Sequence, residues 1–185
     1  MSTLLENFGI QSVYHYAPLH YLPFIVRQKE LLSKPILRQL GFLDTHFRST
    51  SRKQDLKRGF EEYVHLTIEQ YPNILRAKLS RGFPHFKISI SASVIDATEY
   101  HLCRFNIAKT RYLKGGKKAP QESPENGRYY NNKRLPIAVN SEEKEALLSA
   151  NNKKNMIEVL VPQRVSLAEK VSFEFFHNSS SYKLY

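Results

Sequence analysis

The sequence predicts an α+β domain with a split or mixed antiparallel β-sheet. About five or six short strand patterns and about three helical patterns occur, and the two kinds do not alternate along the chain. Regular alternation is typical of a doubly wound parallel sheet, so this order favours antiparallel or mixed pairing. The 185 residues fit one domain of common size, which we expect to span residues 1–185.

The expected strands show period-two alternation or a short run of β-branched and aromatic residues. The clearest alternation is FKISISAS at Phe86–Ser93, and we expect Tyr100–Ala108 to pair with it. Phe60–Ile68 fits a helix and a strand equally well. The other expected strands are Ser12–Ala17, Met156–Val161 and Val171–Phe176.

The expected helices are marked by apolar spacing and by residues that begin or end a helix. His20–Leu32 has mixed helical spacing, with Pro23 tolerated only in the first turn. The segment after Pro72 reads as a helix that Gly82 ends. A third helix begins at residue 140 or 141, where Asn or Ser can cap it. Residues 43–58 and 109–135 are expected to be loops, and a connection as long as the second is usually functional.

Composition excludes several classes of protein. The chain is 41% apolar and 12% aromatic, which argues against disorder. The single cysteine, Cys103, rules out an internal disulfide and a multi-cysteine metal centre. The seven histidines are scattered, so no metal site is predicted, and only a zinc site assembled from distant histidines stays open. No apolar run approaches the ~20 residues of a membrane span. We therefore expect a soluble cytoplasmic protein without a membrane partner.

The charge points to an anionic partner. Formal net charge is +11, and residues 70–121 hold ten Lys and Arg opposed only by Asp96 and Glu99. Lys and Arg neutralise phosphates while tyrosine rings stack on unpaired bases, a combination typical of single-strand binding. An ordinary basic surface is the alternative. The candidates for nucleic-acid contact lie in the 109–135 loop: Lys114, Lys117, Lys118, Tyr129 and Tyr130.

Glu158 is the most unusual residue of the pattern. It lies in NMIEVLVP between apolar neighbours, where a carboxylate has to be exposed, paired or given a role. A charge that protects an edge strand from aggregation is the competing interpretation. Glu174 alternates with Phe173 and Phe175, so we expect it on a solvated face. His15, beside tyrosines on the first strand, fits a hydrogen-bonded structural residue or a ligand-binding one.

Several blocks of the chain resemble the DarT family of DNA ADP-ribosyltransferase toxins. HYAPLHYLPFIVRQKELL at His15–Leu32 is similar to the family's opening block, although Lys29-Glu30 replaces a glycine-containing step. The polar loop to Arg52 is similar to its arginine-bearing segment. Ile157–Pro162 resembles the block that holds the catalytic glutamate. Weaker similarity covers Tyr63-Val64, Tyr71–Leu75 and Asp96–Thr98, whereas His65, Leu66 and Thr67 depart from the family's aromatic run.

The resemblance implies an ADP-ribosyltransferase fold, a split sheet that holds NAD between its halves. NAD is then a consumed co-substrate and not a bound cofactor, which suits the absence of a GxGxxG motif. Glu158 would be the catalytic carboxylate and Arg52 the catalytic arginine, which also binds NAD. The other implied NAD-binding residues are His15, Tyr16, Ala17, Phe24 and Leu32.

The implied activity is transfer of ADP-ribose from NAD to a base of single-stranded DNA. RNA as the acceptor, a protein acceptor, plain NAD hydrolysis, and a non-catalytic single-strand-binding module remain alternatives. Such toxins are usually paired with an antitoxin or a reversing hydrolase, so a partner of that kind is expected. A monomer is expected because no apolar stripe is left over in the pattern.

Overall fold

The computed structural model describes residues 3–42, 60–103, 128–130, 133–135, 137–149, 157–167, 171–177 and 180–184. For residues 73, 74, 77, 128–130, 133–135, 177 and 180–184, only the backbone is described.

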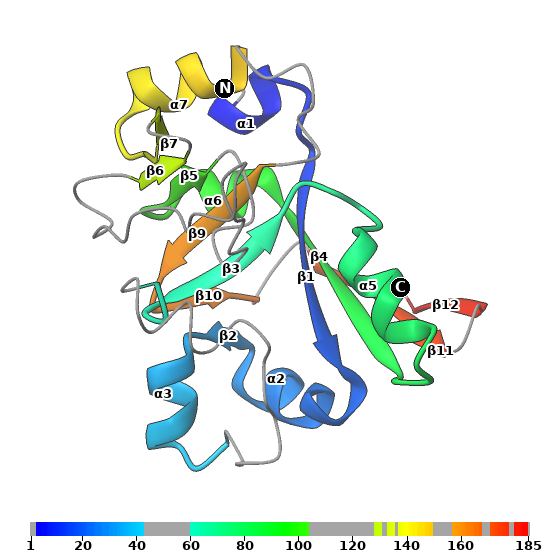
Figure 1. Cartoon of the computed structure of the whole chain (residues 1–185). Helices are drawn as coiled ribbons and strands as arrows, with labels where there is room; N and C mark the ends of the chain where they lie inside the picture. The colour runs from blue at the N-terminus through cyan, green and yellow to red at the C-terminus, as the bar shows by residue number, and fades with distance from the viewer. Residues whose placement is uncertain are drawn as a thin grey trace.

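Eight of the described strands form one sheet in the order β12-β11-β4-β1-β3-β9-β5-β8, and neighbouring strands in it are antiparallel (Figure 1). The α+β class predicted from the sequence is therefore confirmed. The strands are β1 (Ser12–Pro18), β3 (Tyr63–Thr67), β4 (His85–Ser91), β5 (His101–Cys103), β8 (Ile137–Ala138), β9 (Glu158–Pro162), β11 (Val171–His177) and β12 (Ser180–Leu184).

The sheet is divided between β1 and β3. β1 pairs with β4 along its whole length, and β3 pairs with β9 along its whole length. By contrast, the pairing of β1 with β3 consists of the single pair Tyr14–Thr67, and beyond it the two strands separate in Figure 1. We call β12, β11, β4 and β1 the β4 half-sheet, and β3, β9, β5 and β8 the β9 half-sheet. The predicted split is thus present as a divergence within one sheet.

Short elements complete the described structure. β2 (Glu30–Leu32) pairs with β10 (Arg164–Ser166), and β6 (Arg128–Tyr130) pairs with β7 (Lys133–Leu135). None of the described helices has the length and apolar character that a membrane span needs. The helices are α1 (Leu4–Asn7), η1 (Leu19–Tyr21), α2 (Leu22–Gln28), α3 (Lys34–Gln39), α5 (Asn73–Leu79), α6 (Ala92–Asp96) and α7 (Ser141–Ser149).

The main core lies on one face of both half-sheets. Because side chains alternate along a strand, this face takes Val13 of β1, Ile88 of β4 and Val159 of β9, all fully buried. α1, α6 and α7 contribute buried leucine and isoleucine side chains to it. The opposite face of the β9 half-sheet carries a smaller apolar cluster of Phe60, Cys103, Ile137 and Leu160. Glu158, two residues before Leu160 in β9, therefore lies on the face of this smaller cluster.

Three local predictions need correction. The strand at 101–103 pairs with β9 and β8 and not with β4, because strand pairing is decided by long-range packing that alternation does not encode. The helix expected over His20–Leu32 ends at Gln28, where Lys29 takes a left-handed conformation (φ 54°) and turns the chain into β2. Residues 109–135, expected to be a loop, contain the β6–β7 hairpin.

Other local predictions are confirmed. Phe60–Ile68, open between helix and strand, contains strand β3, which fits its alternation of Val64 and Leu66 with polar residues. The third helix is α7, and Asn140 caps it, because its Oδ1 accepts the backbone N–H of Glu143 at 2.9 Å.

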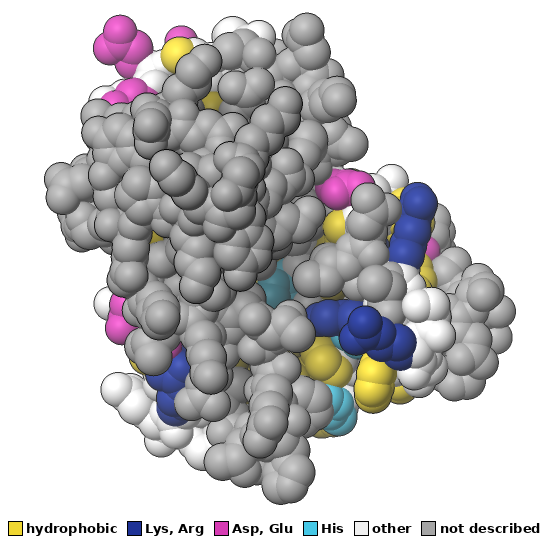
Figure 2. Space-filling model, in the orientation of Figure 1, with side chains coloured by type: hydrophobic (Ala, Val, Ile, Leu, Met, Phe, Trp, Pro, Cys, Tyr) yellow, Lys and Arg dark blue, Asp and Glu magenta, His cyan; other side chains and the backbone are white. Residues whose placement is uncertain are grey.

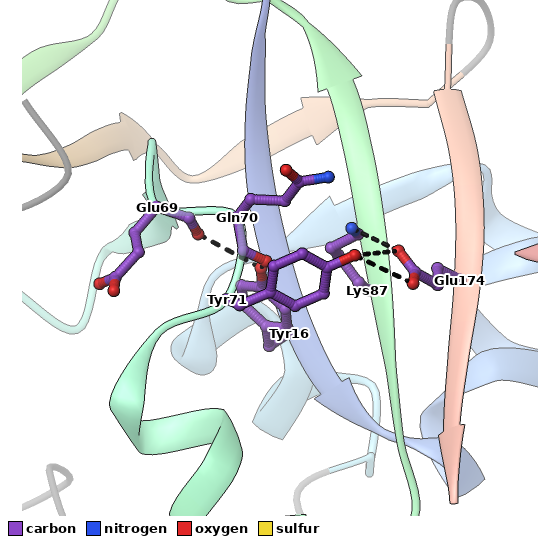
Figure 3. A network of polar contacts seen from close by, with 6 residues as sticks. All are labelled: Tyr16, Glu69, Gln70, Tyr71, Lys87 and Glu174. Atoms are coloured by element: carbon purple, nitrogen blue, oxygen red, sulfur yellow. Dashed lines mark hydrogen bonds and ion pairs between the residues drawn. The ribbon is translucent and has the colours of Figure 1, made fainter. Parts of the chain in front are cut away.

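The expectation that Glu174 is solvated is wrong. Glu174 is 4% exposed, and its carboxylate lies 2.5 Å from Nζ of Lys87, which is 2% exposed and opposite it in β4. The Tyr71 hydroxyl also donates to this carboxylate, at 3.2 Å, and covers the pair (Figure 3). Lys87 therefore does not belong to the exposed basic surface that the charge distribution suggested. The reason is that alternation tells which face a residue is on, but not what covers that face.

The same network attaches the segment before α5 to the sheet. The Tyr16 hydroxyl donates to the backbone carbonyls of Glu69 and Gln70, the residues just before Tyr71 (Figure 3). The Lys87 ammonium lies 4.6 Å from the centre of the Tyr71 ring, within range of a cation–π interaction. The connection from β3 to α5 is thus fixed to the β4 half-sheet on the side away from the main core.

Replacing Lys87 with Met should destabilise the protein by about 3–5 kcal/mol, because it leaves the Glu174 carboxylate buried without its cation. Adding Glu174→Leu should recover most of that loss, since the buried charge is then gone. Urea unfolding at pH 7 measures both variants. A cost below about 1 kcal/mol for the single variant would be typical of an exposed ion pair and would contradict this account.

Candidate active site

Glu158 is a buried acid in the interior of the sheet. It is the first residue of β9, and its side chain is 9% exposed. β9 lies between β3 and β5, so the interpretation of Glu158 as an edge-strand charge is wrong. In the register Glu158 is opposite Thr67 on one side and Cys103 on the other.

This register places Glu158 next to the division of the sheet. Thr67, its neighbour in β3, is also the residue that pairs with Tyr14 of β1. Tyr14, Thr67, Glu158 and Cys103 therefore form one cross-strand row, and this row crosses the point where the half-sheets join. Because paired residues of neighbouring strands project to the same face, these four side chains share the face opposite the main core.

His65 of β3 contacts the acid directly. Its Nδ1 lies 3.0 Å from Glu158 Oε1, and its Nε2 lies 2.9 Å from the backbone carbonyl of Phe60. Both ring nitrogens therefore have polar partners, which fixes the orientation of the imidazole beside the carboxylate.

His15 of β1 reaches the backbone of the same residue. Its Nδ1 lies 3.1 Å from the His65 carbonyl oxygen, which can only accept, so Nδ1 carries a proton and donates. Burial lowers the pKa of His15 to about 4; the bond to the carbonyl opposes this shift, and the charges of His65 and Lys78 add to it. His15 is therefore neutral at pH 7, and its Nε2 carries a lone pair that can accept a hydrogen bond.

The structure connects His15 and Glu158 through His65. By strand alternation the side chain of His15 projects to the main-core face, whereas Glu158 projects to the other face. The carbonyl of His65 accepts from His15, and its ring contacts Glu158. His15 and Glu158, which were predicted to belong to one site, thus lie on either side of the division. His65 contacts both of them.

The other predicted NAD-binding residues have varied environments. Ala17 and Phe24 are buried in the main core, and Leu32 of β2 is partly buried against it. The Tyr16 side chain lies on the opposite face and holds the segment before α5, and burial raises the pKa of Tyr16 well above its usual value. Tyr16 can therefore contribute to a ligand site at β1 only through its backbone, unless the segment that it holds moves.

Several predicted residues lie outside the described part of the chain: Arg52, Lys114, Lys117 and Lys118. Tyr129 and Tyr130 belong to β6, of which the backbone alone is described. On the described surface, Figure 2 shows Lys and Arg side chains gathered over the α5 side of the molecule, beside histidine and apolar side chains. Arg76 and Arg81 are exposed there, whereas burial lowers the pKa of Lys78.

Sequence reasoning missed His65. The signal was present in Tyr63–Thr67, where Val64 and Leu66 alternate with Tyr63, His65 and Thr67, as a strand with one polar face requires. What the sequence does not show is that β3 lies beside β9, and the contact between His65 and Glu158 depends on that pairing. Within the described residues, no three His, Cys, Asp or Glu side chains are grouped to hold a metal ion.

Comparison with solved structures identifies proteins of similar fold. The structure of DarT from Thermus sp. 2.9 in complex with ADP-ribosylated single-stranded DNA matches 85% of this chain and 78% of its own, with a TM-score of 0.54 and 12% identity. The same DarT in complex with NAD+ gives a TM-score of 0.52 at 12% identity, with 85% and 77% covered.

A third structure, DarTG from Thermosipho africanus in complex with ADP-ribose, matches 88% of this chain but 43% of its own, with a TM-score of 0.55 and 12% identity. No protein-family model matches the sequence, and no curated protein shows significant sequence similarity to it. The fold that the DarT resemblance predicted is thus confirmed, and at this level of identity the likeness is one of fold.

The His15 environment predicts how stability changes in acid. The His15 pKa falls from 6.5 to about 4 on folding, so between these values the unfolded chain holds a proton that the folded chain does not. Stability should therefore drop as pH falls from about 6.5 to 4, by up to about 3 kcal/mol from this residue. His15→Gln, which does not titrate, should lose that part of the slope in urea unfolding measured at pH 4.5 and 7. Parallel profiles for the two proteins would contradict the neutral state of His15.

Proposed function

We propose that this chain is a DarT-type mono-ADP-ribosyltransferase that transfers ADP-ribose from NAD to a base of single-stranded DNA. The observation that supports this most is Glu158, a buried carboxylate held beside the division of a sheet whose fold is shared with DarT structures. Those structures contain NAD+ or ADP-ribosylated single-stranded DNA. NAD is then a substrate consumed in each turnover.

Glu158 has the chemical character that the reaction needs. Cleavage of the bond between nicotinamide and ribose sends the bonding electrons to nicotinamide and leaves positive charge on the anomeric carbon. A carboxylate that accepts a hydrogen bond from a ribose hydroxyl and lies near this carbon stabilises the transition state more than the ground state. A base nitrogen of the acceptor then forms the new bond to that carbon and releases its proton to solvent water. Burial helps, because a fixed acid surrounded by few waters acts more strongly on the developing charge.

NAD is proposed to bind where β1 and β3 diverge. β1 pairs with β3 only at Tyr14. After Tyr14, the edge of β1 on the β3 side therefore has no strand partner among the described residues and faces the division. The backbone N–H and C=O of Tyr16 point to this edge and are suited to bind the nicotinamide amide, whereas Ala17, whose backbone groups point to β4, would line the site beside it. The neutral His15 can accept a hydrogen bond from a ribose hydroxyl through Nε2. Phe24 of the main core and Leu32, which packs against it, would line the site with apolar side chains.

Arg52 is proposed to bind the pyrophosphate of NAD and to orient the acceptor base. A guanidinium makes two parallel hydrogen bonds to a phosphate and stays charged at any physiological pH. For that reason we assign it binding and orientation and not removal of the acceptor's proton.

The acceptor is proposed to bind the basic surface. Lys114, Lys117 and Lys118 would contact phosphates, and Tyr129 and Tyr130 would stack on bases, as single-strand binding requires. Exposed Arg76 and Arg81 at α5 add positive charge on the described surface. We further propose that the protein acts as a monomer in the cytoplasm and that an antitoxin or reversing hydrolase accompanies it.

Replacing Glu158 with Gln should abolish transfer of labelled ADP-ribose to DNA oligonucleotides, by at least about 100-fold, because the neutral amide cannot stabilise the developing charge. Binding of the oligonucleotide should stay within about twofold, since Glu158 is not part of the basic surface. The matched control is Glu62→Gln, an exposed glutamate just before β3, which should leave transfer unchanged.

Mass measurement of the products separates the alternatives. Modified RNA in place of modified DNA would indicate that RNA is the acceptor. Free ADP-ribose as the only product would indicate NAD hydrolysis. Oligonucleotide binding without turnover of NAD would indicate a non-catalytic module. Normal transfer by Glu158→Gln would refute the assignment of the acid.

Changing Lys114, Lys117 and Lys118 together to Ala should weaken single-strand binding and reduce its salt dependence. Each contact to a single-strand phosphate contributes about 0.7 to the slope of log K against log salt, so the slope should fall by about 2. Fluorescence anisotropy with a labelled oligonucleotide at several salt concentrations measures it. An unchanged slope would place the DNA-binding surface elsewhere.

A further inference from the structure

We propose that His65 is a positioning residue, whose imidazolium form holds the Glu158 carboxylate in its working orientation and releases it when the ring loses its proton. The effect on catalysis rests on the proposed function. The ion pair itself rests only on the contacts of β3 and β9.

The proton count at His65 follows from its two partners. The Phe60 carbonyl can only accept a hydrogen bond, so His65 Nε2, 2.9 Å away, carries a proton. The hydrogen bond between Nδ1 and Glu158 Oε1, at 3.0 Å, needs a second proton. That proton belongs either to an imidazolium facing a carboxylate or to a carboxylic acid facing a neutral ring. A carboxylic acid is the stronger acid of the two, so the ion pair is the form expected at neutral pH.

Loss of one proton would turn this attraction into repulsion. The carbonyl of Phe60 keeps the remaining proton on Nε2, and Nδ1 then directs its lone pair at Oε1. Two acceptors 3.0 Å apart repel each other, so this contact no longer holds the carboxylate in its orientation. The orientation of Glu158 is thus linked to the charge of His65.

Titratable groups from three strands lie around the pair, among them Tyr14 of β1 in the row of Glu158 and His101 of β5, which is paired with Glu99 at 3.6 Å. β5 presents His101 and Cys103 on the same face, and β3 itself adds Tyr63. From β1, His15 contacts the His65 carbonyl but is neutral at pH 7. Among the described residues, Glu158 is the acid that contacts His65 directly.

The ion pair can be tested without any activity. Nitrogen-15 NMR of histidine-labelled protein distinguishes a ring protonated on both nitrogens from a neutral one. At neutral pH His65 should carry both protons, and Glu158→Gln should lower its titration midpoint by about one unit or more. Glu62→Gln is the control and should leave the midpoint unchanged. A singly protonated His65 at neutral pH, or a midpoint that ignores Glu158→Gln, would overturn the proposal.

The positioning role is tested by the pH profile of transfer. In the native protein kcat should fall on the alkaline side at the midpoint that NMR gives for His65. His65→Gln keeps a donor that does not titrate, so this alkaline limb should disappear while KM for NAD stays within about twofold. His65→Phe removes the donor and should lower kcat at least tenfold across the pH range.

Two outcomes separate this proposal from the proposed function. A fully active His65→Phe, or an alkaline limb that persists in His65→Gln, would overturn the positioning role while leaving the transferase in place. A native protein that transfers no ADP-ribose overturns the proposed function and the catalytic part of this proposal, and the NMR midpoint still decides the ion pair. Thermal unfolding of each variant shows that any loss of rate is not loss of fold.

Discussion

The arrangement of the described structure depends on the weak pairing between β1 and β3. Both strands make full ladders with their outer neighbours, yet one pair, Tyr14–Thr67, connects them. Thr67 is also opposite Glu158 in the antiparallel register of β3 and β9, so Glu158 lies one strand away from this junction. A buried acid is thereby fixed at the place where the sheet opens. The register of the strands thus determines both where the sheet divides and where the acid lies.

The two half-sheets each bury an acid on the same face, and their partners differ in kind. Glu174 in the β4 half-sheet faces the ammonium of Lys87. Glu158 in the β9 half-sheet faces the imidazole of His65, which is charged only when both of its ring nitrogens carry a proton. The first pair, covered by Tyr71, suits a permanent attachment of the segment before α5 to the sheet. The second suits a site whose carboxylate has to interact with something other than its own protein.

The sequence revealed the unusual residue but not its surroundings. Glu158 was recognisable because a carboxylate between apolar strand residues needs a reason, and the α+β class followed from the order of the elements. The interpretation of Glu174 failed because a polar face of a strand is solvated only if nothing packs on it, and Tyr71 does so here. His65 was missed because its role depends on the neighbour of β3, and strand pairing is a long-range property. The local alternation of residues predicts which face of a strand a side chain lies on, whereas tertiary packing decides which residues contact that face.

The two histidines near the division have different neighbours. Burial lowers the pKa of His15 to about 4 and leaves it neutral, whereas His65 contacts a carboxylate at 3.0 Å, which on our proposal pairs with its imidazolium form. On the proposed function this difference has a chemical reason. The nicotinamide ring of NAD carries a positive charge and the anomeric carbon gains one, so a cation at His15 would oppose both binding and bond cleavage. An imidazolium at His65 would instead act on Glu158, whose Oε1 lies 3.0 Å from its Nδ1, and would hold the acid in place.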